Sequence, residues 1–277
     1  GAEYEIEDNR LGTGDRDETS YYADNTIEVV ENLHWTLGGR YDDNSAYGTN
    51  ETWRTTFSYL IEPINSRLHG SYGTSFQAPS FYQTLTPTYG TPGLKAENGE
   101  GWDFGIETAF LDEKVIWDVT LFGNDISDKI GFDMTTLKYK NDESYESHGV
   151  ETSLSWQVCQ DVLIRTNYTY TEAEYEDGTE AERVPEHMAN FSVLWSTLEE
   201  KLNLKASVHY VGKQKSLRSS LVDQDDYTVL NLAGQYELTK ELTLWTSVNN
   251  VFDAEYQEIS GYNSADFNMM AGIRINF

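Results

Sequence analysis

The sequence is poor in several features that mark common protein classes. It has a single cysteine, Cys159, so no disulfide can form within the chain. Lys and Arg total 19 against 47 Asp and Glu, and the resulting charge of -28 argues against a nucleic-acid surface, which must be positive. No run of about 20 apolar residues predicts a transmembrane helix. No basic segment followed by an apolar one opens the chain, so we expect any secretion signal to lie outside it.

Aromatic residues, by contrast, are abundant. The chain has 19 Tyr, 7 Trp and only 5 Pro, and this composition argues against disorder despite the high charge. Low overall hydropathy does not exclude a membrane protein, because a transmembrane barrel carries its signal in segments of about 10 alternating residues. We therefore expect a folded β protein with acidic loops and an aqueous interior.

The last part of the chain shows such alternation clearly. Apolar side chains or threonine occupy every second position in two segments, Leu242, Leu244, Thr246 and Val248, then Met269, Ala271, Ile273, Ile275 and Phe277. Successive side chains of a strand point to opposite faces, so each segment has one mainly apolar face. A chain that ends in this way on an aromatic residue is typical of an outer-membrane barrel, and we predict that Phe277 is part of its assembly signal. The last strand of a soluble sandwich is the alternative.

The same alternation along the whole chain predicts about fourteen strands. Tight turns are expected near residues 31–32, 63–65, 112–114, 159–161, 199–200 and 239–241. They alternate with longer polar connections, which include residues 42–50, 76–99, 138–146, 174–182 and 214–226. A soluble sandwich has no reason to sort its connections, whereas outer-membrane barrels have short periplasmic turns and long extracellular loops. The sequence therefore predicts an all-β, antiparallel, up-and-down transmembrane β-barrel.

Tryptophans lie near the ends of many predicted strands. They are Trp53, Trp102, Trp117, Trp156, Trp195 and Trp245. Ordinary sheet aromatics give this pattern too, but in a barrel these side chains form the interfacial girdle.

Nine segments resemble, in the same order, the barrel of TonB-dependent outer-membrane receptors. They are residues 37–42, 71–80, 91–97, 124–130, 137–141, 148–151, 167–173, 183–187 and 249–253 with Tyr256. Each motif is short, but the ordered set covers nearly the whole chain. The spacing from Asn124 to Glu151 is most similar to cobalamin (vitamin B12) receptors, and catecholate siderophore and colicin I receptors are the close alternative.

The resemblance implies a 22-strand barrel around a plug domain. Residues 1–277 would supply about the last fourteen strands, so the plug and the first barrel strands are expected to be absent. Ala96 stands where the family has proline, and Gln77 and Glu186 stand where basic residues are common. A fragment, a natural truncation and a redesigned barrel all fit these departures.

The implied function is active transport of cobalamin or a ferric siderophore across the outer membrane of a Gram-negative bacterium. Such a chain would contact outer-membrane lipid and the barrel-assembly machinery, and TonB only through the missing plug. No enzyme activity is expected, since the five histidines lack metal-ligand spacing and no nucleophile elbow is present. A plug-less pore and a scaffold without transport activity remain alternatives.

Candidate ligand-binding residues come from the long loops. Tyr82, Tyr89, Tyr139 and Tyr262 are placed to stack on a flat corrinoid or catechol, although tyrosine is common in such loops. Two acidic groups, Asp42-Asp43-Asn44 and Asp223 with Asp225 and Asp226, offer oxygen ligands for Ca²⁺, with a solvated acidic loop as the plainer interpretation. The overall negative charge disfavours an anionic ferric siderophore more than a corrinoid, because like charges repel.

Overall fold

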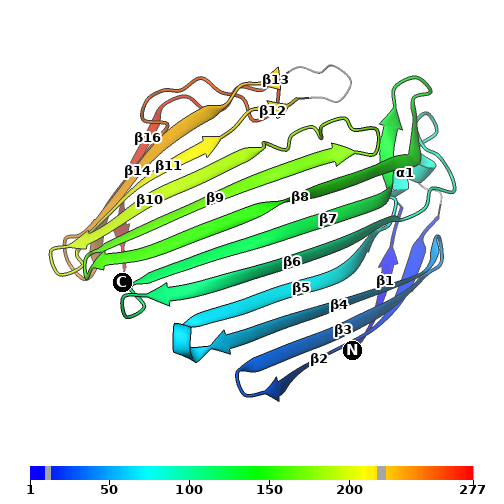
Figure 1. Ribbon diagram of the computed structural model, residues 1–277. Coiled ribbons are helices and arrows are strands. Elements are labelled where there is room, and N and C mark those ends of the chain that lie inside the picture. The colour runs from blue at the N-terminus through cyan, green and yellow to red at the C-terminus, as the bar shows by residue number, and fades with distance from the viewer. Residues whose placement is uncertain (10–13, 217–222, 277) are drawn as a thin grey trace.

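The chain folds into one large antiparallel sheet. The computed structural model describes residues 1–9, 14–216 and 223–276, so Phe277 lies outside the described residues. Fourteen strands each pair with the next in chain order, and the sheet curves into a trough (Figure 1). The prediction of about fourteen strands in an up-and-down arrangement is confirmed.

The bounds of the elements follow the alternating segments closely. The main sheet contains β1 (Ala2–Glu7), β2 (Arg16–Val30), β3 (Leu33–Asn44), β4 (Gly48–Ile61), β5 (Ser66–Gln77), β6 (Glu97–Phe110), β7 (Val115–Asp133), β8 (Lys138–Cys159), β9 (Val162–Tyr175), β10 (His187–Thr197), β11 (Leu202–Val211), β14 (Tyr227–Glu237), β15 (Leu242–Asn249) and β16 (Asn268–Ile275). The smaller elements are the 3-10 helix η1 (Glu62–Ile64), the helix α1 (Phe81–Leu85) and the two-stranded ribbon of β12 (Gln214–Lys215) and β13 (Asp223–Gln224).

The connections are sorted between the two ends of the sheet. Figure 1 shows short turns along one end and the long loops, α1 and the β12–β13 ribbon along the other. Two of the short turns place an asparagine in the left-handed region, Asn32 with φ 67° and Asn65 with φ 47°. Asparagine tolerates this conformation better than most residues, so it favours a tight reversal at these positions.

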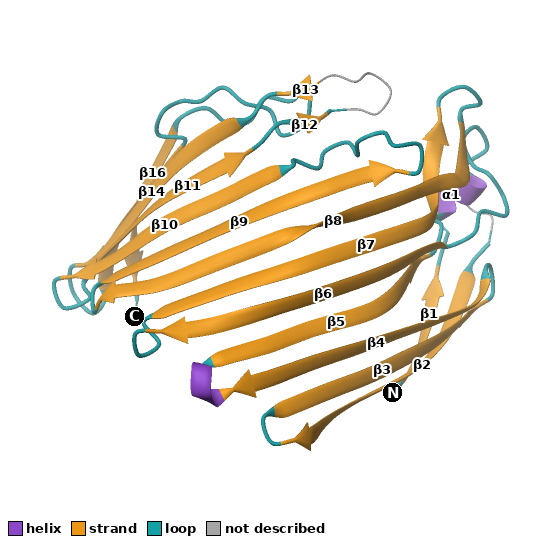
Figure 2. Ribbon diagram, viewed as in Figure 1, coloured by secondary structure: helices purple, strands orange, loops and turns teal. Residues whose placement is uncertain are grey.

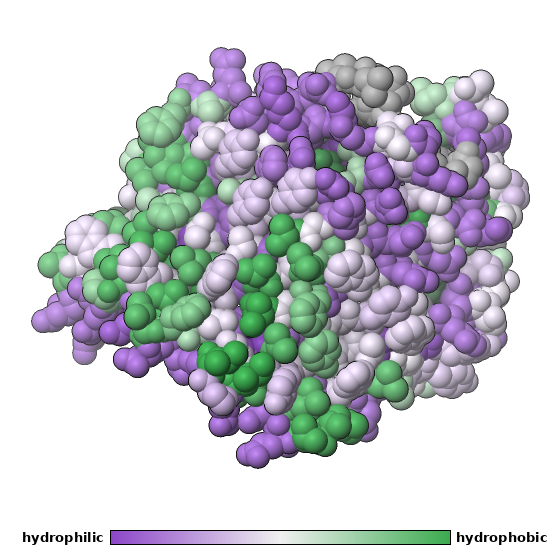
Figure 3. Space-filling view, viewed as in Figure 1, coloured by the Kyte–Doolittle hydropathy of each residue, from purple (hydrophilic) through white to green (hydrophobic). Residues whose placement is uncertain are grey.

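The convex face of the sheet is apolar and exposed. Leu37 on β3 is 62% exposed and Ile273 on β16 is 64% exposed, and tryptophans of six strands, β3, β4, β6, β7, β8 and β10, are 39% to 46% exposed. Figure 3 shows hydrophobic side chains across the middle and lower left of this face, with hydrophilic ones on the side of the long loops. Water would penalise an apolar surface of this extent, whereas lipid does not. The convex face is therefore the membrane-facing side.

One member of the predicted tryptophan girdle was assigned to the wrong face. Trp245 pairs across the sheet with Gly272, and a Cβ at position 272 would lie 2.6 Å from the Trp245 ring. The ring thus occupies the concave face, where glycine leaves room for it. Trp35, which the girdle prediction omitted, is 44% exposed on the convex face.

Two connections predicted to be long are not long loops. In residues 42–50, β3 runs to Asn44 and β4 begins at Gly48, which leaves a turn of residues 45–47. The connection predicted at residues 138–146 is not a loop either. β7 continues to Asp133 and β8 starts at Lys138, so these strands form a hairpin with a turn at residues 134–137. Phe132 pairs with Tyr139, and Asp133 pairs with Lys138. Aromatic and opposite-charge pairs stabilise neighbouring strands, and they extend this hairpin well into a polar segment.

The sheet has two free edges. Within residues 1–9, 14–216 and 223–276, no backbone pairing joins β1 to β16. Figure 2 shows these two strands on opposite margins of the trough. The described strands thus form a continuous barrel wall that does not close on itself. Among the described residues, no helix has the length and apolar character that spanning a bilayer requires.

Candidate ligand site on the long loops

Four aromatic side chains from separate segments meet at the end of the wall that carries the long loops. Tyr82 of α1 lies edge-on to Tyr139 of β8, with ring centroids 6.2 Å apart. Tyr139 contacts Phe132 of β7 at 5.0 Å, and Phe132 contacts Tyr89 at 5.8 Å. Tyr82 is 50% exposed and Phe132 is 37% exposed, so the cluster presents ring surface to the solvent.

The local sequence explains how the loop of residues 78–96 reaches these positions. Ser80 caps α1 by accepting a hydrogen bond from the Gln83 backbone N–H at 3.2 Å, and Gln83 Oε1 accepts from the Ser80 backbone N–H at 2.8 Å. Gly90 then allows a close return of the chain, because a Cβ there would lie 2.6 Å from Thr86 backbone atoms. The capped helix and the tight return give the loop a defined shape.

The β7–β8 hairpin holds the far half of this loop. The Tyr139 backbone N–H donates to the Tyr89 carbonyl at 3.2 Å, and Lys138 Nζ donates to the Gly90 carbonyl at 3.0 Å. The Asn141 side chain binds both the N–H and the carbonyl of Lys95, at 2.8 and 3.1 Å. These bonds fix Tyr89 against Phe132 and make the aromatic cluster part of an ordered surface.

The charge around the cluster differs from that of the chain as a whole. Lys95, Lys138 and Lys140 all lie in the segments that build the site. Two of them have carboxylate partners, Asp128 at 3.4 Å from Lys95 and Asp133 at 3.8 Å from Lys140. Lys95 is nevertheless 73% exposed. The site therefore combines aromatic faces with ammonium donors on an otherwise strongly acidic protein.

Three of the four tyrosines selected from the sequence come together in this cluster, and one does not. Tyr262 lies in the connection between β15 and β16 and is 74% exposed. Sequence reasoning also missed Phe132. The available signal was its place two residues after Ile130 in the strand pattern, but the long connection was predicted at residues 138–146 and Phe132 was not selected.

The first acidic group does not converge on one point. The Asp42 side chain is 1% exposed on the concave side, where Oδ1 accepts from Ser20 Oγ at 2.6 Å and from Arg40 Nε at 2.7 Å. Asp43 follows it along β3 and points to the other face. Asn44 Oδ1 accepts from the Ala46 backbone N–H at 2.9 Å. The Arg40 guanidinium thus already balances the negative charge of the buried Asp42 carboxylate.

The second acidic group lines a pocket. Asp223, Asp225 and Asp226 border a pocket of about 510 Å³, together with Glu255 and Asp266. Lys215 Nζ lies 2.7 Å from Asp223 and lowers the pKa of that carboxyl by hydrogen bonding and by its charge. In the part of the chain that the structure describes, no group of three or more His, Cys, Asp or Glu is arranged to hold a metal ion. Calcium in these loops stays a prediction.

The inner wall carries a second, wider hollow of about 930 Å³ over β4 to β8. It is bordered by Arg54, Asp103 and Glu151, by hydroxyl and amide side chains, and by the aromatic residues Trp102 and Phe122. A wall that is apolar outside, polar inside and loop-bearing at one end defines an outer-membrane barrel protein. The chain belongs to the family described as TonB dependent receptor-like, beta-barrel, which matches residues 3–251.

Known transporters and receptors resemble this chain in sequence or in structure. The vitamin B12 transporter BtuB of Vibrio cholerae is 26% identical over 260 residues, which are 91% of this chain and 41% of the transporter. A mutant of the ferric enterobactin receptor PfeA of Pseudomonas aeruginosa superposes with a TM-score of 0.80 at 21% identity, covering 95% of this chain and 45% of the receptor. The copper transporter OprC superposes with a TM-score of 0.81 at 15% identity, covering 95% and 48%. This chain thus spans less than half of each relative.

Proposed function

We propose that this chain is the wall of an outer-membrane active transporter, and that its ligand is cobalamin. The observation that carries the proposal is the exposed cluster of Tyr82, Tyr89, Phe132 and Tyr139 on the loops. The sequence similarity to a vitamin B12 transporter over 91% of the chain supports the choice of ligand. Energy coupling through TonB would require a plug domain and belongs to the complete transporter.

The physical basis is stacking combined with hydrogen bonding. Tyrosine and phenylalanine present large rigid faces, and each aromatic contact contributes about 0.5–1.5 kcal/mol beyond the apolar area that it buries. A flat corrin ring can lie against Tyr82 and Phe132. Its amide groups accept hydrogen bonds, which the nearby lysines Lys95 and Lys138 supply as donors.

A ferric siderophore is the second candidate, and one observation favours it. Three lysines, Lys95, Lys138 and Lys140, belong to the segments that carry the aromatic cluster, although the whole chain has a charge of -28. Local positive charge reduces the repulsion that an anionic ligand meets elsewhere on the protein. A Lys95→Gln variant separates the two ligands, because the 73% exposed Lys95 side chain does not hold the loop, and the loss of its positive charge weakens an anionic ligand strongly at low salt and a neutral corrinoid little.

Ligand titration of the protein in outer-membrane vesicles tests the proposal. We expect Tyr82→Ala and Tyr139→Ala each to weaken cobalamin binding by about 2- to 10-fold, which corresponds to the loss of one aromatic contact. Tyr262→Ala is the matched control, since this tyrosine lies apart from the cluster and should leave the affinity unchanged. Equal effects of all three substitutions would refute the assignment of the site.

Ion conductance distinguishes a transporter wall from an open pore. If the complete protein in planar bilayers shows steady conductance without ligand or TonB, the plug-less pore is correct and the transporter proposal fails. A closed, silent protein that binds cobalamin supports transport. Solubility without detergent would instead favour a scaffold, since the exposed convex face would then have to be buried elsewhere.

We also propose that Phe277 takes part in recognition by the barrel-assembly machinery. Support comes from the alternation of Met269, Ala271, Ile273 and Ile275, which leads to the terminal aromatic residue. Deleting Phe277 should reduce the amount of heat-modifiable protein in the outer membrane. Deleting the exposed loop residue Asn263 serves as control, and unchanged insertion of the Phe277 deletion would contradict the role.

A further inference from the structure

Arg16, the first residue of β2, has an unusually enclosed side chain for a cation at the rim of the wall. Its side chain is only 12% exposed and forms an ion pair with Glu7 of β1. One guanidinium nitrogen, Nη1, donates to the Pro79 carbonyl at 2.8 Å. The same group lies 4.7 Å from the centre of the Phe81 ring and 5.4 Å from that of Tyr47.

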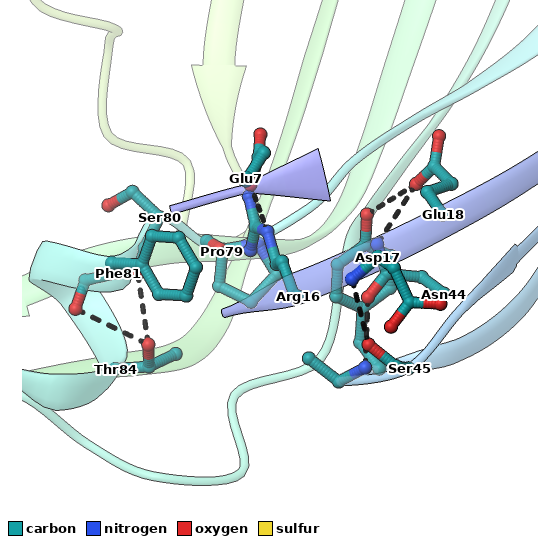
Figure 4. Close-up of polar contacts among 12 residues, drawn as sticks. Glu7, Arg16, Asp17, Glu18, Asn44, Ser45, Pro79, Ser80, Phe81 and Thr84 are labelled. Atoms are coloured by element: carbon teal, nitrogen blue, oxygen red, sulfur yellow. Dashed lines mark hydrogen bonds and ion pairs between the residues drawn. The ribbon is translucent and has the colours of Figure 1, made fainter. Parts of the chain in front are cut away.

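These contacts join parts of the molecule that are far apart in the sequence. Glu7 and Arg16 belong to the first two strands, and Tyr47 lies in the turn between β3 and β4. Pro79 and Phe81 belong to the loop of residues 78–96, at the capped start of α1. Figure 4 shows the Arg16 side chain between Glu7 and the Phe81 ring, with Pro79 beside it.

The loop of residues 78–96 is therefore held at two places. The β7–β8 hairpin holds its far half through Tyr89, Gly90 and Lys95, as described above. Arg16 holds its near half, which carries α1 and hence Tyr82. The backbone bonds of α1 are few, and a helix of one turn has little stability of its own. The contact with Arg16 adds to the order that the Ser80 cap and the Thr91-to-Gln83 backbone bond supply.

An arginine suits this role better than a lysine does. The planar guanidinium can stack on an aromatic ring while its edge donates to a carbonyl and a carboxylate in the same plane. The enclosure of the group strengthens these contacts, because water competes less for them. Lysine would retain the ion pair with Glu7 but would lose the simultaneous stacking and in-plane donation.

We propose that Arg16 is a positioning residue that anchors α1 and thereby sets Tyr82 in the ligand-binding cluster. The second half of this proposal rests on the proposed function, whereas the first half concerns the loop alone. Arg16 does not itself contact the ligand. It acts through Pro79 and Phe81 on the helix that carries the tyrosine.

Hydrogen exchange of the ligand-free protein tests the anchor. The Thr84 amide donates to the Ser80 carbonyl at 3.1 Å and reports on α1, while the Tyr139 amide reports on the hairpin side. In Arg16→Gln we expect Thr84 to exchange about tenfold faster or more and Tyr139 to remain unchanged. Arg16→Lys should give an intermediate rate. Arg54→Gln is the control, because Arg54 is 63% exposed, pairs only with Asp24 among the ion pairs of the described residues, and lies away from the loop.

Ligand binding tests the second half through a double-mutant cycle. Arg16→Gln should weaken cobalamin binding about as much as Tyr82→Ala does, and the double variant should bind no more weakly than Tyr82→Ala alone. Additive losses would show that Arg16 does not act through Tyr82 and would overturn the positioning role. Unchanged exchange of Thr84 in Arg16→Gln would overturn the anchor itself. If no variant binds cobalamin, the exchange data still decide on the anchor, and only the proposed ligand fails.

Discussion

The imidazole of His69 on β5 reaches Asp118 on β7 across the intervening strand, with Nε2 2.9 Å from Oδ2 of the carboxylate. The strand between them, β6, places Gly105 directly opposite both His69 and Thr120. A Cβ at position 105 would lie 2.5 Å from the His69 ring. Glycine at this position therefore lets two side chains bond across a third strand on the inner face of the wall.

Gly105→Ala should destabilise the wall by about 1–3 kcal/mol, the usual cost of overpacking a filled site. The added methyl group would collide with His69 and Thr120 and disrupt the bond to Asp118. Urea unfolding in lipid vesicles measures the effect. Gly39→Ala is the matched control on the membrane-facing side of β3, where the nearest atom lies 3.9 Å from the new Cβ. Equal stability of the two variants would contradict the close packing at Gly105.

A row of exposed acidic residues crosses the four adjacent strands β6 to β9. Glu100 pairs with Asp125, Asp125 with Glu146, and Glu146 with Glu174. Like charges directly opposite each other destabilise a sheet. Glu146→Gln removes two such repulsions and should stabilise the protein by about 0.2–1 kcal/mol for each, with a smaller gain at high salt. Thermal unfolding at two salt concentrations measures the gain.

Glu51 provides the control for this prediction. It is also an exposed acid near the end of a strand, but its partner on β3 is Tyr41 rather than another acid. Glu51→Gln should change the stability little and without salt dependence. A gain equal to that of Glu146→Gln would show that general charge reduction, and not the paired row, is responsible.

The β12–β13 ribbon should loosen in acid. Lys215 lowers the pKa of Asp223 in the folded protein, first by a hydrogen bond and then by its charge. A lowered folded pKa means that the pair stabilises the ribbon above the unfolded pKa of the carboxyl, and that this stability is lost as the pH falls through the folded pKa. The change should therefore occur below about pH 4, the ordinary range of aspartic acid.

Hydrogen exchange of the ribbon at pH 6 and pH 3, corrected for intrinsic rates, measures this loosening. Asp223→Asn should exchange faster already at pH 6 and show a smaller further change at pH 3, because the carboxylate that lies 2.7 Å from Lys215 is already absent at both pH values. Asp225→Asn is the control, since Asp225 is 90% exposed and 3.7 Å from its lysine. The same pH response in Asp223→Asn and in the parent protein would refute the role of this pair.

We expect calcium to bind in the loop pocket and not at the buried Asp42. Asp225 and Asp226 border the pocket beside Tyr256, whereas Asp42 is already paired with Arg40. Terbium luminescence sensitised by tyrosine tests this, because the ion must lie near a tyrosine to emit. An Asp225→Asn/Asp226→Asn variant should lose the signal and Asp42→Asn should keep it. The opposite result would favour the site at Asp42, and no signal in the parent protein would refute calcium binding.

Much of the architecture could be predicted because strands have a period of two that is written directly in the residues. The alternation of Leu242, Leu244 and Val248 identifies a strand and its membrane-facing side without any tertiary information. The polar segments between strands likewise indicate which connections are short and which are long. The prediction failed at residues 42–50 and 138–146, where polar residues continue the strands; in the second case Phe132 and Tyr139 stabilise the pairing.

The site was only partly accessible to the same reasoning. Tyr82, Tyr89 and Tyr139 were selected as loop aromatics, but nothing in their spacing distinguishes them from Tyr262. Loops have no periodicity, so the sequence does not tell which of their side chains meet. Phe132 lies in β7, and it was missed because the prediction did not extend that strand to Asp133.

The sequence by itself determined the all-β class, the strand order, the presence of one apolar face and the resemblance to TonB-dependent receptors. These properties follow from the local geometry of strands and turns, which each residue specifies with its near neighbours. Only the tertiary structure decided that Phe132 completes the aromatic cluster and that Arg16 contacts Phe81, whereas the alternation of β15 already places Trp245 opposite its apolar face. Arg16 and Phe81 are separated by 65 residues, and pairing of several strands and folding of one loop must occur before their side chains can meet.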